Sequence, residues 1–92
     1  MPVRKNSCLS ISKNTVSREV DGKLVLMSLE TGAFYSFNHT GALIWKLLSD
    51  RKTPPEIVAQ VAQEFDISDK TARRDVALLL KELEKELLIE NA

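Results

Sequence analysis

The chain has 92 residues, 43% of them apolar, and its 13 basic side chains balance 13 acidic ones. This length supports one hydrophobic core. No stretch approaches the roughly 20 apolar residues of a transmembrane helix, and the polar start is unlike a signal peptide, so we expect a cytoplasmic domain. With one cysteine, Cys8, and one histidine, His39, neither an internal disulfide nor a local zinc cluster can form, and we expect no metal and no cofactor.

The sequence also lacks the residue patterns that enzymes use. Cys8 and His39 are far apart, and the three glycines form no phosphate-binding loop. The acidic residues near the C-terminus alternate with Lys81 and Lys85, as on a solvated helix face. We therefore expect a protein that is not an enzyme.

Strand patterns occupy the first part of the chain. Residues 15–20 are rich in β-branched side chains, and Asp21-Gly22 then provides a hairpin turn. Residues 23–29 are apolar nearly throughout, which indicates a central strand covered on both faces for part of its length. A turn at Gly32 leads into an aromatic strand at residues 33–37.

Helix patterns occupy the second part, at about residues 38–49, 53–65 and 68–87. Asn38, Thr53 and Ser68 are the expected N-caps, and Glu56 completes a capping box with Thr53. Apolar side chains recur at helical spacing after each cap. In the last helix this stripe comprises Ala72, Val76, Leu79, Leu80, Leu83 and Leu87.

These elements predict an α+β fold in which a three-stranded antiparallel sheet at about residues 15–37 precedes three helices. The composition of elements resembles a winged helix. Residues 1–14 are polar for most of their length and predict a flexible N-terminal arm, while residues 15–92 form the single domain.

Two features indicate a peptide-binding surface. If the strand at residues 33–37 is a sheet edge, its unpaired backbone groups offer a template for an added strand, and no lysine or proline protects it. At 100° per residue, Leu78 lies on the side of the last helix away from the core stripe, beside Arg74, Asp75 and Glu82. Leu78 would then line a groove against the third strand.

Two alternatives remain open at this stage. The last helix occupies the recognition position of a winged helix-turn-helix DNA-binding protein and carries Lys70, Arg73 and Arg74, although Asp69 and Asp75 lie among them. The net charge of zero gives little field for phosphate contacts. The other alternative is a purely structural subunit, held by a large enzyme through the apolar second strand.

Residues 29–48, LETGAFYSFNHTGALIWKLL, combine a turn, an aromatic strand, Asn-x-x-Gly and a helix with Ile-Trp. Together with residues 53–58, residues 64–67 and the Asp75, Leu79 and Leu83 spacing, this pattern resembles the PqqD-like family over about residues 15–90. The segment at residues 38–45 is more similar to the broad family, including its lasso-type members, than to the pyrroloquinoline quinone protein itself. A lasso or related peptide pathway is therefore our first expectation.

The resemblance implies a precursor-peptide recognition element for ribosomally synthesised, posttranslationally modified peptides. Such a domain binds the leader segment as an added strand and delivers it to a partner such as a radical S-adenosylmethionine protein or a leader peptidase. It also implies a three-stranded sheet packed on three helices, with no nucleic acid or membrane partner. On this chain the implied leader-binding residues are Ala33, Phe34, Tyr35, Ser36 and Phe37 on the strand, and Arg74, Asp75, Leu78 and Glu82 on the helix.

Overall fold

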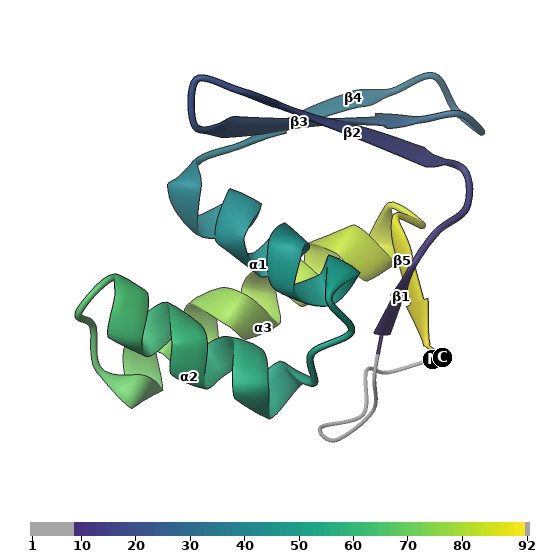
Figure 1. The fold of residues 1–92 in the computed structure, drawn as a ribbon. Coiled ribbons are helices and arrows are strands. Elements are labelled where there is room, and N and C mark those ends of the chain that lie inside the picture. Colours follow the sequence, from purple (N-terminus) through teal and green to yellow (C-terminus); the bar gives the residue numbers. More distant parts are fainter. Residues whose placement is uncertain (1–8, 92) are drawn as a thin grey trace.

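A three-stranded antiparallel sheet lies on one side of a layer of three helices (Figure 1). The computed structural model describes residues 9–91. The sheet consists of β2 (Thr15–Val20), β3 (Lys23–Ser28) and β4 (Phe34–Phe37), and the helices are α1 (His39–Ser49), α2 (Pro54–Glu64) and α3 (Asp69–Lys85). This arrangement confirms the predicted α+β fold with the sheet before the helices.

The strand order is β2-β3-β4, so β3 is central as predicted. Asp21 and Gly22 join β2 to β3 with φ values of 51° and 78°, the positive values that a tight primed hairpin turn requires. Along β3, Leu24 and Leu26 are buried against the helices, whereas Val25 and Met27 alternate onto the opposite face.

Cover on both faces of β3 is not what the structure shows. The helices cover only the face of Leu24 and Leu26, and no described element covers the other face (Figure 1). Met27 is half-buried there because it pairs with Val16 on one side and Phe34 on the other. Neighbouring strands therefore supply the partial cover that the apolar sequence requires.

A second, two-stranded sheet joins the ends of the described chain. Strand β1 (Leu9–Ile11) pairs antiparallel with β5 (Ile89–Asn91), and Leu9 is only 1% exposed. The structure differs here from the expected flexible arm, because residues 9–14 belong to the fold; residues 1–8, including Cys8, lie outside the described residues. Residues 9–11 do alternate between apolar and polar side chains, but an alternation of three residues is too short to predict a strand.

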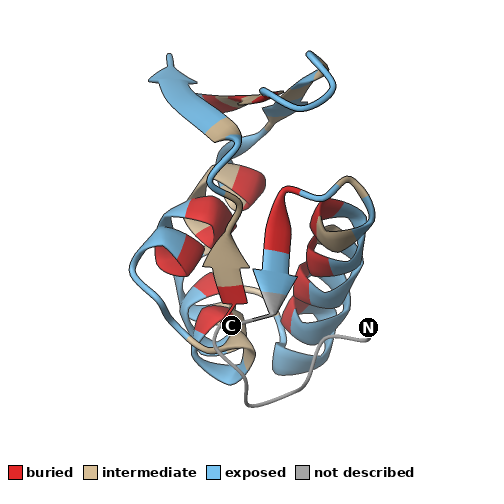
Figure 2. Cartoon of the chain, turned by 90° about the vertical axis from the view of Figure 1, so that its right-hand side faces the viewer, coloured by how far each residue is buried: buried red, intermediate tan, exposed pale blue. Residues whose placement is uncertain are grey.

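The core lies between the inner face of the sheet, the three helices and β5 (Figure 2). Trp45 is 5% exposed and belongs to it, as predicted. The buried helical residues follow the predicted stripes with one exception: Leu87 was expected in the core and is instead 63% exposed. Helix α3 ends at Lys85, so Leu87 no longer follows the helical period, and Leu88 is buried in its place.

All three predicted N-caps form. The Asn38 side chain accepts a hydrogen bond from the Gly41 amide at 3.1 Å, and the Ser68 hydroxyl accepts one from the Thr71 amide at 3.1 Å. In the capping box, the Thr53 amide donates to Glu56 Oε1 at 2.9 Å while the Glu56 amide donates to Thr53 Oγ1 at 3.4 Å. The bond from the Thr53 backbone, followed by that from its hydroxyl, lowers the pKa of Glu56.

Loss of this cap has a pH-dependent cost. Thr53→Ala is expected to lower the free energy of unfolding by about 1 kcal/mol at pH 7, as N-cap removal does elsewhere. Because the folded pKa of Glu56 is lowered, its ionised form stabilises the fold above its ordinary pKa, and that stabilisation is lost as the pH falls through the folded value. Urea unfolding at several pH values measures the difference, with Thr53→Ser as the control that keeps the cap. Equal stability of Thr53→Ala and wild type at pH 7 would contradict the prediction.

Leu87 follows the C-cap of α3, at a position where glycine is the preferred residue. Leu87 has a φ of 61°, and around it the Leu87 amide donates to the Glu84 carbonyl at 3.1 Å and the Leu88 amide to the Leu83 carbonyl at 2.9 Å. This is the Schellman pattern, whose left-handed residue costs least as glycine.

We expect Leu87→Gly to raise the free energy of unfolding by about 1 kcal/mol, because glycine removes the steric cost of the left-handed conformation. Leu87→Ala is the matched control, since it removes the exposed leucine and keeps the Cβ. Urea unfolding measures the free energy of unfolding of both variants. A glycine variant no more stable than the alanine variant would contradict this explanation.

Candidate functional site

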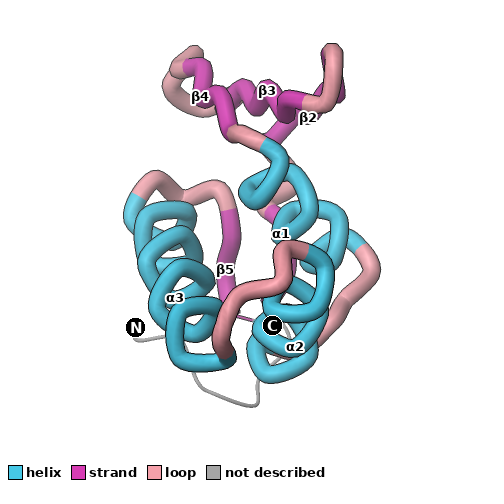
Figure 3. Tube along the Cα trace, turned by 90° about the vertical axis from the view of Figure 1, so that its left-hand side faces the viewer, coloured by secondary structure: helices cyan, strands magenta, loops and turns pink. Residues whose placement is uncertain are grey.

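Strand β4 forms an edge of the three-stranded sheet. It pairs with β3 in the register Leu24↔Phe37 to Met27↔Phe34, and no described strand pairs with its other side. The strand reads Phe-Tyr-Ser-Phe and carries none of the charged or proline residues that commonly protect sheet edges. Figure 3 shows β4 on the side of the sheet that lies over α3, with β2 on the opposite side.

The hydrogen-bonding alternation of the sheet identifies which β4 backbone groups are open. The Ser28 amide donates to the Ala33 carbonyl at 2.9 Å, so this is a hydrogen-bonded pair, and the alternation of an antiparallel ladder makes Leu26–Tyr35 and Leu24–Phe37 the next ones. The backbone groups of Phe34 and Ser36 therefore point away from β3, toward the open edge.

The side chains of β4 alternate in the same way. Tyr35 and Phe37 are half-buried and pack against the core, whereas Phe34 is 71% exposed and Ser36 is exposed on the outer face. A strand added beside β4 would direct every second side chain to the face that carries Tyr35 and Phe37, which is the face toward the helices.

A hollow of about 330 Å³ lies at the end of β4, between the start of α1 and the outer side of α3. We call it the α3 groove. Its floor is apolar and its rim is polar or acidic. The lining residues are Phe37, Asn38, Thr40, Gly41, Ile44, Asp75, Leu78, Leu79 and Glu82.

The α3 groove brings together four of the residues selected from the sequence: Phe37, Asp75, Leu78 and Glu82. Leu78 is 59% exposed, as its helical angle predicted. The remaining selected residues do not line the hollow: Ala33, Phe34, Tyr35 and Ser36 lie on or next to the open strand, and Arg74 is exposed elsewhere on α3.

Sequence reasoning missed part of the groove floor. Ile44 and Leu79 were assigned to the core, and they do pack there, but each also lines the groove. Gly41 is a buried residue of α1 that faces Phe37, and a Cβ at this position would lie 2.6 Å from the Phe37 Cβ. The Asn-x-x-Gly pattern in the sequence could have indicated this contact. It places the N-cap Asn38 one helical turn before Gly41, the residue that packs closely against Phe37.

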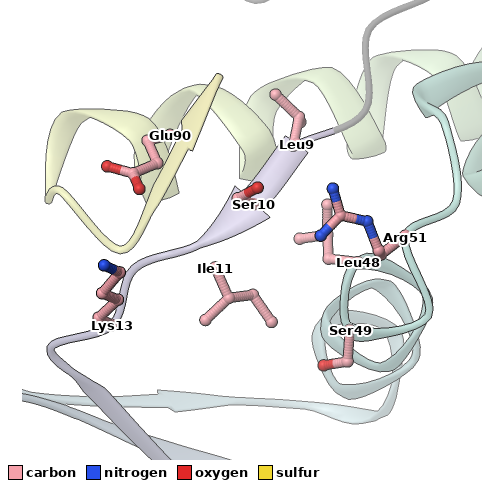
Figure 4. A pocket seen from close by; sticks show the side chains of 8 residues that line it. All are labelled: Leu9, Ser10, Ile11, Lys13, Leu48, Ser49, Arg51 and Glu90. Atoms are coloured by element: carbon pink, nitrogen blue, oxygen red, sulfur yellow. The ribbon is translucent and has the colours of Figure 1, made fainter. Parts of the chain in front are cut away.

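A larger hollow of about 460 Å³ lies elsewhere, near the pairing of β1 with β5 and the end of α1 (Figure 4). Its lining mixes apolar side chains such as Ile11 and Leu48 with Lys13 and Glu90, which carry opposite charges. Neither β4 nor α3 contributes to it. The α3 groove is nevertheless the candidate site, because it lies at the end of the open edge strand β4.

The described residues contain no group of three or more histidine, cysteine, aspartate or glutamate side chains that would hold a metal ion. His39 is exposed at the start of α1. No helix within residues 9–91 has the length and apolar content to cross a membrane.

The basic residues at the start of α3 offer little to a DNA backbone. Arg73 forms an ion pair with Asp69 at 3.3 Å, and Asp75 directly follows Arg74 on the helix. Binding to DNA phosphates requires several uncompensated cations on one face of a protein, and the start of α3 mixes its cations with carboxylates.

Three solved structures share this fold. "TbiB1 in Complex with the TbiA(beta) Leader Peptide" is 34% identical, with a TM-score of 0.84 over 88% of this chain and 94% of that one. "Lasso peptide synthetase B1 complexed with the leader peptide" is 23% identical, with a TM-score of 0.82 over 89% and 96%. A solution structure of the PqqD truncation of Methylobacterium extorquens PqqCD, described as a stand-alone RiPP recognition element, is 18% identical, with a TM-score of 0.77 over 96% and 94%.

The family described as "Coenzyme PQQ synthesis protein D (PqqD)" matches residues 23–89, and the chain belongs to this family. The resemblance predicted from the sequence is thereby confirmed. So is its subtype, because identity to the two leader-peptide complexes exceeds identity to the PqqD truncation. A comparison with curated proteins gives no significant match.

Proposed function

We propose that this protein is a non-catalytic chaperone that binds the leader segment of a ribosomally synthesised, posttranslationally modified peptide. The leader adds as a strand to the open edge of β4 and lies over α3. The observation that carries the proposal is an unprotected strand edge beside a groove with an exposed leucine, Leu78. The 34% identical TbiB1, whose structure is a complex with the TbiA(beta) leader peptide, supports it independently.

In this proposal the strand and the helix have different tasks. The backbone of Ala33, Phe34, Tyr35, Ser36 and Phe37 holds the leader in register, and within it Phe34 and Ser36 provide the free donors and acceptors. On α3, Leu78 contacts an apolar leader side chain and Asp75 and Glu82 contribute charge at the groove, while Arg74 contributes a basic group outside its lining. Main-chain bonds give affinity and side-chain contacts give specificity.

The bound leader must then reach a second protein. The partner in this proposal is a modifying enzyme or a leader peptidase, and lasso peptide biosynthesis is the favoured pathway because of the similarity to a lasso peptide synthetase B1. The proposal also requires a cytosolic location, since ribosomally made precursors arise there. No residue of the site has a catalytic task.

Titration of the folded protein tests the proposal. The proposal places a short precursor beside the gene for this chain, and its fluorescently labelled leader is expected to bind with a Kd of about 1 μM or tighter, measured by anisotropy. A scrambled peptide of the same composition is the control. A correctly folded protein that binds the leader no better than the scrambled peptide would overturn the proposed function.

A further inference from the structure

All charged residues that line the α3 groove are acidic. Asp75 and Glu82 lie at its rim on either side of Leu78, and none of the residues that line it is basic. Within residues 9–91 neither carboxylate has a hydrogen-bond or ion-pair partner for its side chain, whereas Asp69 on the same helix is paired with Arg73. An occupant that brings a cation would therefore find two unengaged carboxylates beside an apolar floor.

Basic residues on α3 do not line the groove. Arg74, Lys81 and Lys85 are exposed on the same helix, but all three lie outside the lining. The other two elements that form the groove add no charge to it, because β4 contributes Phe37 and the start of α1 contributes Thr40, Gly41 and Ile44. The charged residues that line the groove are thus Asp75 and Glu82.

Helix and strand spacings fit a particular leader pattern. At 1.5 Å per residue, Asp75 and Glu82 are about 10 Å apart along α3, with Leu78 between them. Helix-facing side chains of an added strand recur every second residue, roughly 7 Å apart. For a leader that runs along α3, one such side chain covers Leu78 while the next one reaches a carboxylate, and the methylenes of a lysine or arginine would rest on the apolar floor.

We propose that Asp75 and Glu82 select a leader segment that carries a lysine or arginine two residues from an apolar side chain, both on the helix-facing side of the added strand. This inference rests on the proposed function and specifies the leader chemistry that the site takes. Charge complementarity at the groove gives specificity, while the backbone of β4 gives most of the affinity.

Selection from a phage-displayed library of random peptides tests the inference. Three immobilised proteins are compared: wild type, Asp75→Asn with Glu82→Gln, and the control Glu64→Gln with Glu84→Gln. The control removes two negative charges outside the groove. Wild type and control are expected to enrich a lysine or arginine spaced two residues from an apolar residue, and the groove variant is expected to lose that enrichment.

A selected peptide then allows the interaction between its basic residue and the two carboxylates to be measured directly. Replacing its basic residue by methionine is expected to weaken binding to wild type roughly tenfold and to leave binding to the groove variant unchanged. Binders without basic enrichment, or the same enrichment on the groove variant, would overturn the inference and leave leader binding standing. A folded protein that selects no peptide at all would overturn the proposed function as well.

Discussion

Leu78→Asn is expected to weaken leader binding about tenfold or more and to leave the fold intact. Leu78 is 59% exposed in the described chain, so its side chain makes little contribution to the core and is available to a partner. In the complex an asparagine of nearly the same size would lose the apolar contact and place an unpaired amide in the groove. Together these effects amount to about 1.5–3 kcal/mol, and 1.4 kcal/mol is a tenfold change in Kd.

Ala77→Asn is the matched control for this variant. Ala77 is exposed on the same helix and does not line the α3 groove, so its replacement carries the same cost in helix propensity without touching the leader. Anisotropy titration of both variants with the labelled leader gives the comparison. Equal leader affinities for wild type and Leu78→Asn would show that Leu78 does not contact the leader.

Gly41→Ala is expected to destabilise the protein by about 1–2 kcal/mol, although alanine is the better helix former. The added Cβ would lie 2.6 Å from the Phe37 Cβ, and an atom bonded to the backbone cannot move aside as a flexible side-chain end can. Relief would require a shift of β4 against α1, which displaces the floor of the groove. Leader affinity is therefore expected to fall along with stability.

Lys46→Ala, at an exposed position of the same helix, serves as the control and is expected to change stability by less than about 0.5 kcal/mol. Urea unfolding measures both variants. If Gly41→Ala were as stable as wild type, the close packing of Phe37 on α1 would not be what requires glycine at this position.

Local chemistry made most of the fold predictable. The Asp21-Gly22 turn, the Asn38, Thr53 and Ser68 caps and the helical stripes each depend on a few neighbouring residues, and all of them form as the sequence indicates. The pairing of β1 with β5 depends on residues at opposite ends of the chain, and the short alternation at residues 9–11 was too weak to predict it. Leu87 was misassigned because its spacing continues the stripe of α3, while the helix ends before it.

The candidate site was predictable to a lesser degree. Helical angles alone place Leu78, Asp75 and Glu82 together, but the sequence does not determine that β4 is an edge strand, since that depends on the order of the strands in the sheet. The sequence also does not distinguish a residue that lies only in the core from one that lies in the core and also lines a groove. Ile44 and Leu79 have the spacing of core residues and serve both surfaces.

Addition of the leader as a strand to β4 is the central claim, and amide hydrogen exchange at single residues tests it most directly. In the free protein, the amides of Phe34 and Ser36 point to the open edge, whereas those of Tyr35 and Phe37 face β3. Leader binding is expected to slow exchange at Phe34 and Ser36 more than tenfold, with a much smaller change at Tyr35 and Phe37. Unchanged exchange at Phe34 and Ser36 in the saturated complex would contradict strand addition at this edge.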